Sequence, residues 1–178
     1  MKLRTMILGL GMIASTLSFT AQSAMASVRS TEAIEKQVRH ELNMLPYGNV
    51  FDYMTFTVDN GRVTLTGEVT NPVLKSDANN VVKRIEGVEH VDNQIQVLPL
   101  SPMDDGLRVR LFRTIYGYPA LQKYELGLNK SIRIIVKNGH VTLIGVVDSQ
   151  MDKNIAGLRA NSVPGIFSVD NQLKVVKS

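Results

Sequence analysis

The sequence predicts an α+β protein made of two tandem domains, each with the element order α-β-β-α-β. Three observations support this prediction. Residues 55–97 align with residues 133–175 without a gap, and 16 of the 43 aligned pairs are identical. An Asn-Gly pair separates alternating apolar runs in both copies, and amphipathic helical segments flank both hairpins. We therefore expect each copy to form a three-stranded mixed sheet with two helices packed on one face.

An amphipathic helix opens each copy. In the first copy, Thr31 is the expected N-cap, because apolar residues follow it at helical spacing and acidic residues occupy the first turn. In the second copy, Asp104 or Asp105 is the expected N-cap. The apolar positions that define the buried stripes are Ile34, Val38 and Leu42 in the first helix, and Leu107, Leu111 and Ile115 in the second.

The hairpins follow these helices. Asn60-Gly61 and Asn138-Gly139 lie between strands of alternating apolar and polar residues. Both residue types tolerate positive φ, which two-residue hairpin turns require. Gly67 and Gly145 take inward strand positions, and we expect a helix to pack close to the sheet there.

A second helix and a third strand complete each copy. We expect two further apolar stripes, formed by Leu74, Ala78, Val81, Val82 and Ile85 in the first copy and by Met151, Ile155, Leu158 and Val163 in the second. Gly87 and Gly165 follow as helix stops. The Asp-Asn-Gln runs at 92–94 and 170–172 start the last strands, where the asparagine side chain is expected to bond neighbouring backbone.

The first 26 residues have the pattern of an export signal. Lys2 and Arg4 precede an apolar stretch of about 14 residues, which is shorter than the roughly 20 that a spanning helix needs, and a small-x-small site ends it at Ala26. We expect cleavage before Ser27 and a periplasmic protein. Because the chain has no cysteine, we expect neither disulfides nor a lipid-modified cysteine. The predicted boundaries are signal peptide 1–26, domain 1 at 27–98, linker 99–103 and domain 2 at 104–178.

Charge is divided unequally between the copies. Residues 27–98 carry 7 basic and 10 acidic residues, whereas residues 99–178 carry 11 basic and 6 acidic residues. The fold itself cannot require this asymmetry. The unequal charge indicates that the second copy is adapted to an anionic partner.

The repeated pattern resembles the BON domain, a family named for a bacterial osmotically inducible periplasmic protein and nodulation proteins. The resemblance lies in the pattern G-x-V-T-L-x-G-x-V, followed by a glycine and then by V-x-N at the start of the last strand. This pattern occurs at residues 60–69 with 85–95, and again at 138–147 with 163–173. The opening helices match only by amphipathicity. The resemblance implies a non-enzymatic envelope protein associated with osmotic or envelope stress and with phospholipid surfaces. In a tandem lipoprotein relative, the opening helix of the second copy engages anionic lipid.

One stretch is a candidate binding site. Arg108, Arg110 and Arg113 alternate with Phe112, Tyr116 and aliphatic residues on the predicted second opening helix. This composition suits a helix that lies on an anionic surface. It equally suits an ordinary core helix with solvated arginines. Phe112 and Tyr116 distinguish the two interpretations, since only a binding face would expose both.

Patterns typical of catalysis are missing from the sequence. It contains no nucleophile elbow, phosphate-binding loop or cysteine nucleophile, and His40, His90 and His140 are scattered. We therefore predict no enzyme activity, no cofactor and no metal, and we do not expect nucleic acid as a partner. Two hypotheses remain. The chain is a peripheral module that binds anionic phospholipid through domain 2, or it is a soluble periplasmic chaperone or adaptor for exported protein clients.

Overall fold

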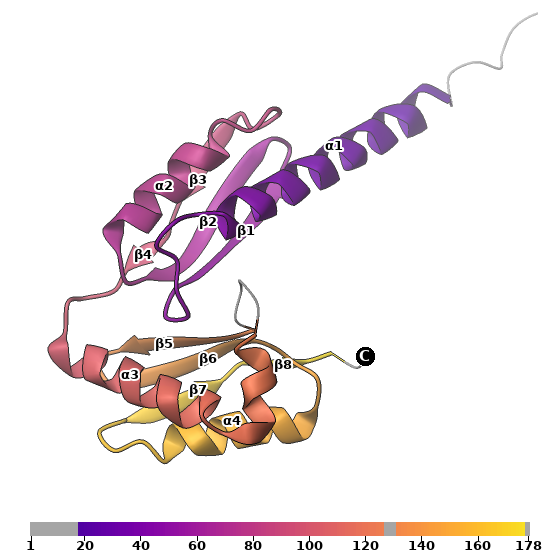
Figure 1. Ribbon diagram of the computed structural model, residues 1–178. Coiled ribbons are helices and arrows are strands. Elements are labelled where there is room, and N and C mark those ends of the chain that lie inside the picture. Colours follow the sequence, from indigo (N-terminus) through magenta and orange to yellow (C-terminus); the bar gives the residue numbers. More distant parts are fainter. Residues whose placement is uncertain (1–17, 127–130, 177–178) are drawn as a thin grey trace, which may run out of the picture.

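The computed structural model describes residues 18–126 and 131–176, with side chains of the first helix described from residue 31 onward. Two domains of the predicted α+β class follow one another along the chain (Figure 1). The elements of domain 1 are α1 (Ser18–Asn43), β1 (Tyr53–Asp59), β2 (Arg62–Val69), α2 (Pro72–Val82), β3 (His90–Asn93) and β4 (Gln96–Val97). Those of domain 2 are α3 (Pro102–Tyr116), the 3-10 helix η1 (Pro119–Tyr124), β5 (Ile132–Lys137), β6 (His140–Val147), α4 (Gln150–Asn161), β7 (Ser168–Asn171) and β8 (Lys174–Val175).

Each domain has a mixed sheet with its second strand in the centre. β2 pairs antiparallel with β1 and parallel with β3 and β4, which are two halves of one interrupted third strand. β6 has the same relations to β5, β7 and β8. The two helices of each domain cover one face of its sheet and bury its core there (Figure 1). The predicted fold class is confirmed.

The hairpin turns are confirmed as well. Asn60 and Asn138 have φ values of 46° and 53°, and the glycines after them have φ values of 77°. Asn93 and Asn171 also act on backbone, as expected. Each donates from its amide nitrogen to a helix carbonyl, on Lys75 and Lys153 respectively, at 2.8 Å. The Asp-Asn-Gln runs therefore attach the third strand to the second helix.

Both predicted N-caps of the opening helices are wrong. α1 continues through Thr31 and back to Ser18, because the residues before Thr31 are compatible with a helix and no proline interrupts them. Most of the predicted signal peptide, residues 1–17, lies outside the described residues, and its cleavage stays a prediction. α3 is capped by Ser101, whose hydroxyl accepts a hydrogen bond from the Asp104 N–H. The buried Asp104 carboxylate instead accepts from the N–H groups of Asn138 and Gly139 in the β5–β6 turn.

Two further details differ from expectation. Gly67 and Gly145 do face a close neighbour, but it is a backbone carbonyl at the start of the adjacent strand, that of Tyr53 in β1 or of Ser131 just before β5, and not a helix. In α4, Met151 and Leu158 are exposed, and the buried side chains are Asp152, Ala156 and Ala160. The helix is rotated because its small residues let it approach β7, where Gly157 lies against the Asn171 amide.

Domain 2 has an insertion between its first helix and its hairpin, which includes η1 and has no counterpart between α1 and β1. A polar cluster holds this insertion in place. The hydroxyl of Tyr124 in η1 donates to the Asp152 carboxylate at 2.7 Å, and Lys123 pairs with Asp152 and Asp148 at 3.0 and 2.9 Å. Burial raises the pKa of Asp152, but hydrogen bonds from Tyr124, Lys123 and Ser149 outweigh it and hold the pKa below its usual range. The carboxylate therefore stays charged and fixes η1 to α4.

The two domains are docked. Val50, in the loop before β1, is buried among the core residues of domain 2, and its carbonyl accepts from the Ile134 N–H at 2.9 Å. The Asp52 carboxylate holds this loop to domain 1 through Thr70. On the outer face of β5, Arg133 donates to the Asn49 carbonyl and Lys137 pairs with Glu68 at 3.2 Å. One residue of domain 1 thus completes the core of domain 2.

Candidate functional site

The candidate site residues lie on α3, whose buried stripe is the predicted one. Leu107, Leu111 and Ile115 are fully buried in the domain 2 core. This fixes the rotation of the helix, and it sorts the five candidate side chains into two sets.

Arg108 belongs to the buried set. Its side chain is 5% exposed, it donates to the Val136 carbonyl at 2.7 Å, and it forms an ion pair with Asp105. Val136 is on β5, the edge strand of the sheet. Arg108 therefore covers the open edge of domain 2 and is not a free surface cation.

Tyr116 has the same role at the other end of β5. It is 1% exposed, and its hydroxyl donates to the Ile132 carbonyl of β5. Burial raises the pKa of Tyr116 well above its usual value, an effect that the bond to Ile132 only partly offsets. Phe112 is half-buried, and its ring packs against those of Tyr116 and Phe51 at centroid distances of 5.1 and 6.4 Å. Phe112 and Tyr116 are therefore not exposed together, which favours a core role for these two residues over a shared binding face.

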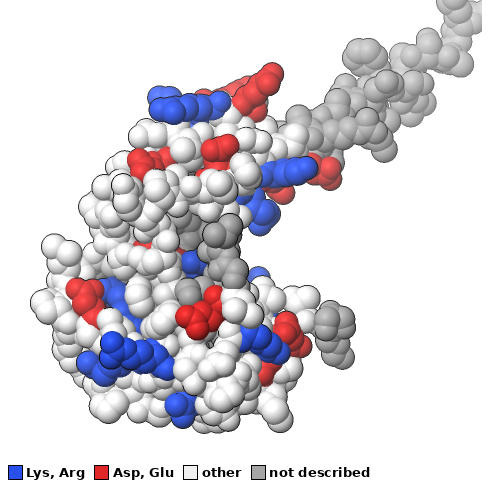
Figure 2. All heavy atoms as spheres, in the orientation of Figure 1, with Lys and Arg blue, Asp and Glu red and all other residues white. Residues whose placement is uncertain are grey.

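Arg110 and Arg113 form the exposed set. Neither makes an ion pair with an acidic side chain among the residues the structure describes. The guanidinium of Arg110 lies near Gly165, in the turn that leads to β7. Figure 2 shows basic side chains gathered on the surface over α3. These two arginines are available to an anionic partner.

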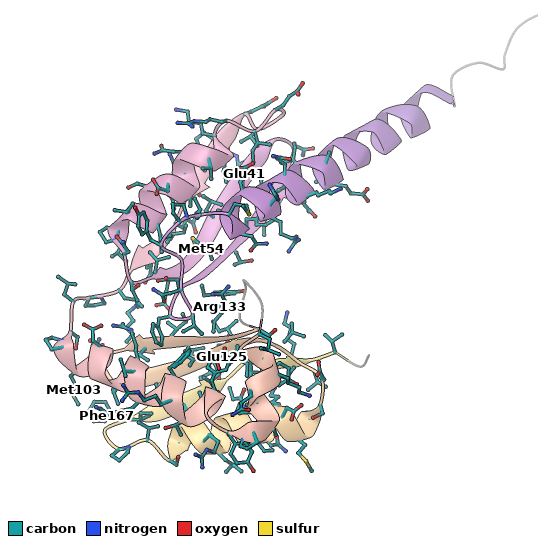
Figure 3. The ribbon with its side chains drawn as sticks, viewed as in Figure 1. Glu41, Met54, Met103, Glu125, Arg133 and Phe167 are labelled. Atoms are coloured by element: carbon teal, nitrogen blue, oxygen red, sulfur yellow. The ribbon has the colours of Figure 1, made fainter. Side chains whose placement is uncertain are left out.

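Two apolar side chains that the sequence analysis did not single out lie at the same end of domain 2. Met103 is 57% exposed and Phe167 is 72% exposed. The Phe167 ring packs over Gly139, whose N–H bonds Asp104, the neighbour of Met103. Figure 3 shows Met103 and Phe167 projecting at this end. The repeat alignment contained the signal for one of them, since Phe167 occupies the position of Glu89 in the first copy.

The exposed side of α3 carries basic and apolar side chains from its first turn, with Met103, to its last turn, with Arg113. We define the α3 patch as Met103, Arg110, Arg113 and Phe167. Two unpaired guanidinium groups can attract anionic head groups, and two large apolar side chains can insert at the head-group boundary. In residues 18–126 and 131–176, no cluster of three or more His, Cys, Asp or Glu side chains could hold a metal ion.

A groove lies between the domains. It is an open groove of about 1020 Å³, lined mainly by apolar side chains of both domains. Met44, Leu45 and Met54 line it from domain 1, and Val109 and Phe112 from domain 2. Figure 3 shows Met54 and Arg133 at this junction. Across the described part of the chain, no helix has the length and hydropathy to cross a bilayer.

The comparison with family models agrees with the repeat and the fold. The BON domain model matches residues 30–99 and again residues 121–177. The chain belongs to the BON domain family. The second match begins after α3, so the helix that carries the arginines lies outside the residues that the BON model matches. Of the α3 patch, Phe167 lies inside the second match, whereas Met103, Arg110 and Arg113 lie between the two matched segments.

Among known proteins, the chain is similar to the outer membrane lipoprotein DolP of Haemophilus influenzae. The two are 29% identical over 123 residues, which is 66% of this chain and 58% of the relative. Two solved structures of CdsD, a structural protein of the type III secretion system of Chlamydia trachomatis, also match. They are 15% and 16% identical, cover 80% and 79% of this chain and 92% and 96% of their own chains, and have TM-scores of 0.30 and 0.28. TM-scores this low establish no common arrangement of the whole chains.

Proposed function

We propose that this BON protein is exported to the bacterial envelope, binds anionic phospholipid surfaces peripherally through the α3 patch, and supports envelope integrity under osmotic or related stress. The observation that carries the proposal is the exposed and unpaired state of Arg110 and Arg113, on the helix whose first turn carries the exposed Met103. Arg108 and Tyr116 contribute by holding α3 on β5, and they do not contact the lipid. The similarity to an outer membrane lipoprotein supports an envelope location.

The expected strength follows from the charges. Each basic residue near an anionic leaflet contributes about 1 kcal/mol. Replacing Arg110 and Arg113 with glutamine should therefore weaken binding roughly thirtyfold. Replacing Met103 and Phe167 with serine should weaken binding at high salt as well, because insertion of apolar groups is not screened.

The test is co-sedimentation of the processed chain, residues 27–178, with phosphatidylglycerol or phosphatidylcholine vesicles at low and high salt. The proposal predicts salt-sensitive binding to the phosphatidylglycerol vesicles and its loss in Arg110→Gln/Arg113→Gln. The matched control is Arg62→Gln/Lys83→Gln, which removes the same charge from exposed positions of domain 1. Equal losses in both variants would mean that net charge drives binding, and would contradict a defined patch.

A second candidate function is favoured by the apolar groove between the domains. A periplasmic chaperone or adaptor needs a surface that accepts varied apolar segments, and flexible methionines such as Met44 and Met54 suit that task. If neither kind of vesicle binds the chain, the phospholipid proposal fails and this second function takes its place.

A further inference from the structure

The free edge of β1 carries backbone groups that point away from the sheet. Asp59 and Arg62 flank the two-residue turn and therefore exchange hydrogen bonds across the hairpin. By alternation, the N–H and C=O groups of Met54, Phe56 and Val58 point outward. Within the described residues, no backbone or side-chain group bonds to them.

The equivalent edge in domain 2 is covered. Of the outward groups of β5, the Ile132 carbonyl accepts from Tyr116, the Ile134 N–H donates to Val50, and the Val136 carbonyl accepts from Arg108. Superposing the apolar stripes of α1 and α3 puts Glu35 at the place of Arg108 and Asn43 at the place of Tyr116. The Glu35 carboxylate cannot donate to a strand carbonyl, and among the described residues Asn43 makes no bond to β1, so α1 does not cover β1 in the way that α3 covers β5.

The strand also lacks the usual features that keep a sheet edge from pairing. Its sequence, Tyr-Met-Thr-Phe-Thr-Val-Asp, contains no proline and no lysine, and its one charge is at the last residue. Five of its seven residues have high β-propensity, and its outward backbone groups are unpaired among the described residues, so the strand is a template for another strand. This edge is suited to pairing with an extended strand.

We propose that β1 pairs antiparallel with β1 of a second copy of this chain, about a two-fold axis at Phe56. In this register Phe56 faces Phe56 and Met54 faces Val58, so all six outward groups of each strand are bonded. Tyr53 then faces Asp59, and Thr55 faces Thr57. The strand is self-complementary because no like charges meet, and this favours a second copy over an unrelated partner.

The proposal goes beyond phospholipid binding, and it has a consequence for it. A dimer carries two α3 patches, and binding of one patch to a surface raises the effective concentration of the other. Pairing also removes the exposed edge of the sheet. Self-association would thus increase avidity and protect against uncontrolled edge pairing.

The test compares two double variants of the processed chain by sedimentation velocity over a concentration series. Thr55→Lys/Thr57→Lys places lysine opposite lysine twice in the proposed register. Thr55→Lys/Thr57→Glu has the same lysine but places it opposite a glutamate of the partner. Both variants change the same two outward-facing side chains, which lie beside Thr66 and Thr64 of β2, so their effects on folding are matched. Circular dichroism checks the fold of each.

We expect the wild-type chain and the Lys/Glu variant to dimerise, and the Lys/Lys variant to dimerise at least about tenfold more weakly. Two results would overturn the proposal. One is a wild-type chain that stays monomeric up to about 0.1 mM. The other is a Lys/Lys variant that dimerises as strongly as the Lys/Glu variant, which would assign the dimer to another surface.

Discussion

The outer faces of β1 and β5 occupy equivalent places in the repeat and differ in every residue. β5 presents Arg133, Ile135 and Lys137, of which the two cations bind domain 1 and Ile135, between them, is 2% exposed. β1 presents Thr55, Thr57 and Asp59, which range from half-buried to exposed. The outer face of β5 thus contacts the neighbouring domain, whereas the equivalent face of β1 is an open surface. The comparison shows that on these two strands the copies differ in role through their side chains.

The same division is seen inside the domains. Leu74 of α2 is fully buried in the core of domain 1, and the residue aligned with it in α4 is Asp152. Domain 2 tolerates a carboxylate there because η1, which has no counterpart in domain 1, supplies Tyr124 and Lys123 as partners. The insertion and the polar residue therefore belong to one feature.

The largest effect should come from the side chain that covers the β5 edge. Arg108→Ala removes a buried, charge-assisted bond and leaves the Val136 carbonyl without its partner, and should cost about 2–3 kcal/mol of unfolding free energy. Glu35→Ala, at the equivalent place on α1, should change stability by less than about 0.5 kcal/mol. Urea unfolding followed by circular dichroism measures both. Equal costs would show that α1 and α3 hold their strands in the same way.

Acid sensitivity should distinguish the domains next. The folded-state pKa of Asp152 is lowered, so its stabilising contribution is present at neutral pH and is lost as the pH falls through that folded value, below about pH 4. Asp152→Asn should cost about 1 kcal/mol at pH 7 and should flatten the acid limb of the stability curve. Thermal unfolding from pH 7 to pH 2 checks this, with Asp170→Asn, an exposed position, as the control. A wild-type acid limb in Asp152→Asn would assign the titration to other carboxylates.

The smallest effect concerns domain docking. Lys137→Asp introduces the residue found at this place in the first copy and puts a second carboxylate beside Glu68. The ion pair is partly exposed, so its loss should cost less than about 1 kcal/mol, and the effect should diminish with added salt. Lys174→Asp makes the same charge change at an exposed position and should be neutral. Amide chemical shifts of Gln96 and Asn49 report whether the domains have separated.

The repeat and the Asn-Gly turns predicted the order of elements and the sheet topology, because backbone geometry at those residues depends on local sequence. The face of α4 was not predicted. Met151 and Leu158 fit a helical stripe, yet the gapless alignment places Asp152, and not Met151, on the position of the buried Leu74. Apolarity misled there because the burial of Asp152 depends on partners 28 and 29 residues away in the chain.

The candidate site was predicted in part. The sequence identified α3 and its arginines, but it could not separate Arg110 and Arg113 from Arg108. That separation depends on where the edge of β5 lies relative to the helix, which is a tertiary contact. Met103 and Phe167 are distant in sequence, and only the Asp104 bonds to the 138–139 turn bring them to one end of the domain. Whether this end binds lipid stays a prediction.

Val50 also determines what can be cut from this chain. A fragment that starts at the linker would contain every helix and strand of domain 2 but would lack the side chain that fills its core and the carbonyl that bonds Ile134. A fragment that ends at the linker would expose Val50 to water. Since synthesis produces the N-terminal end first, domain 1 can fold and present this loop before β5 is complete, and the second copy then completes its folding on the first.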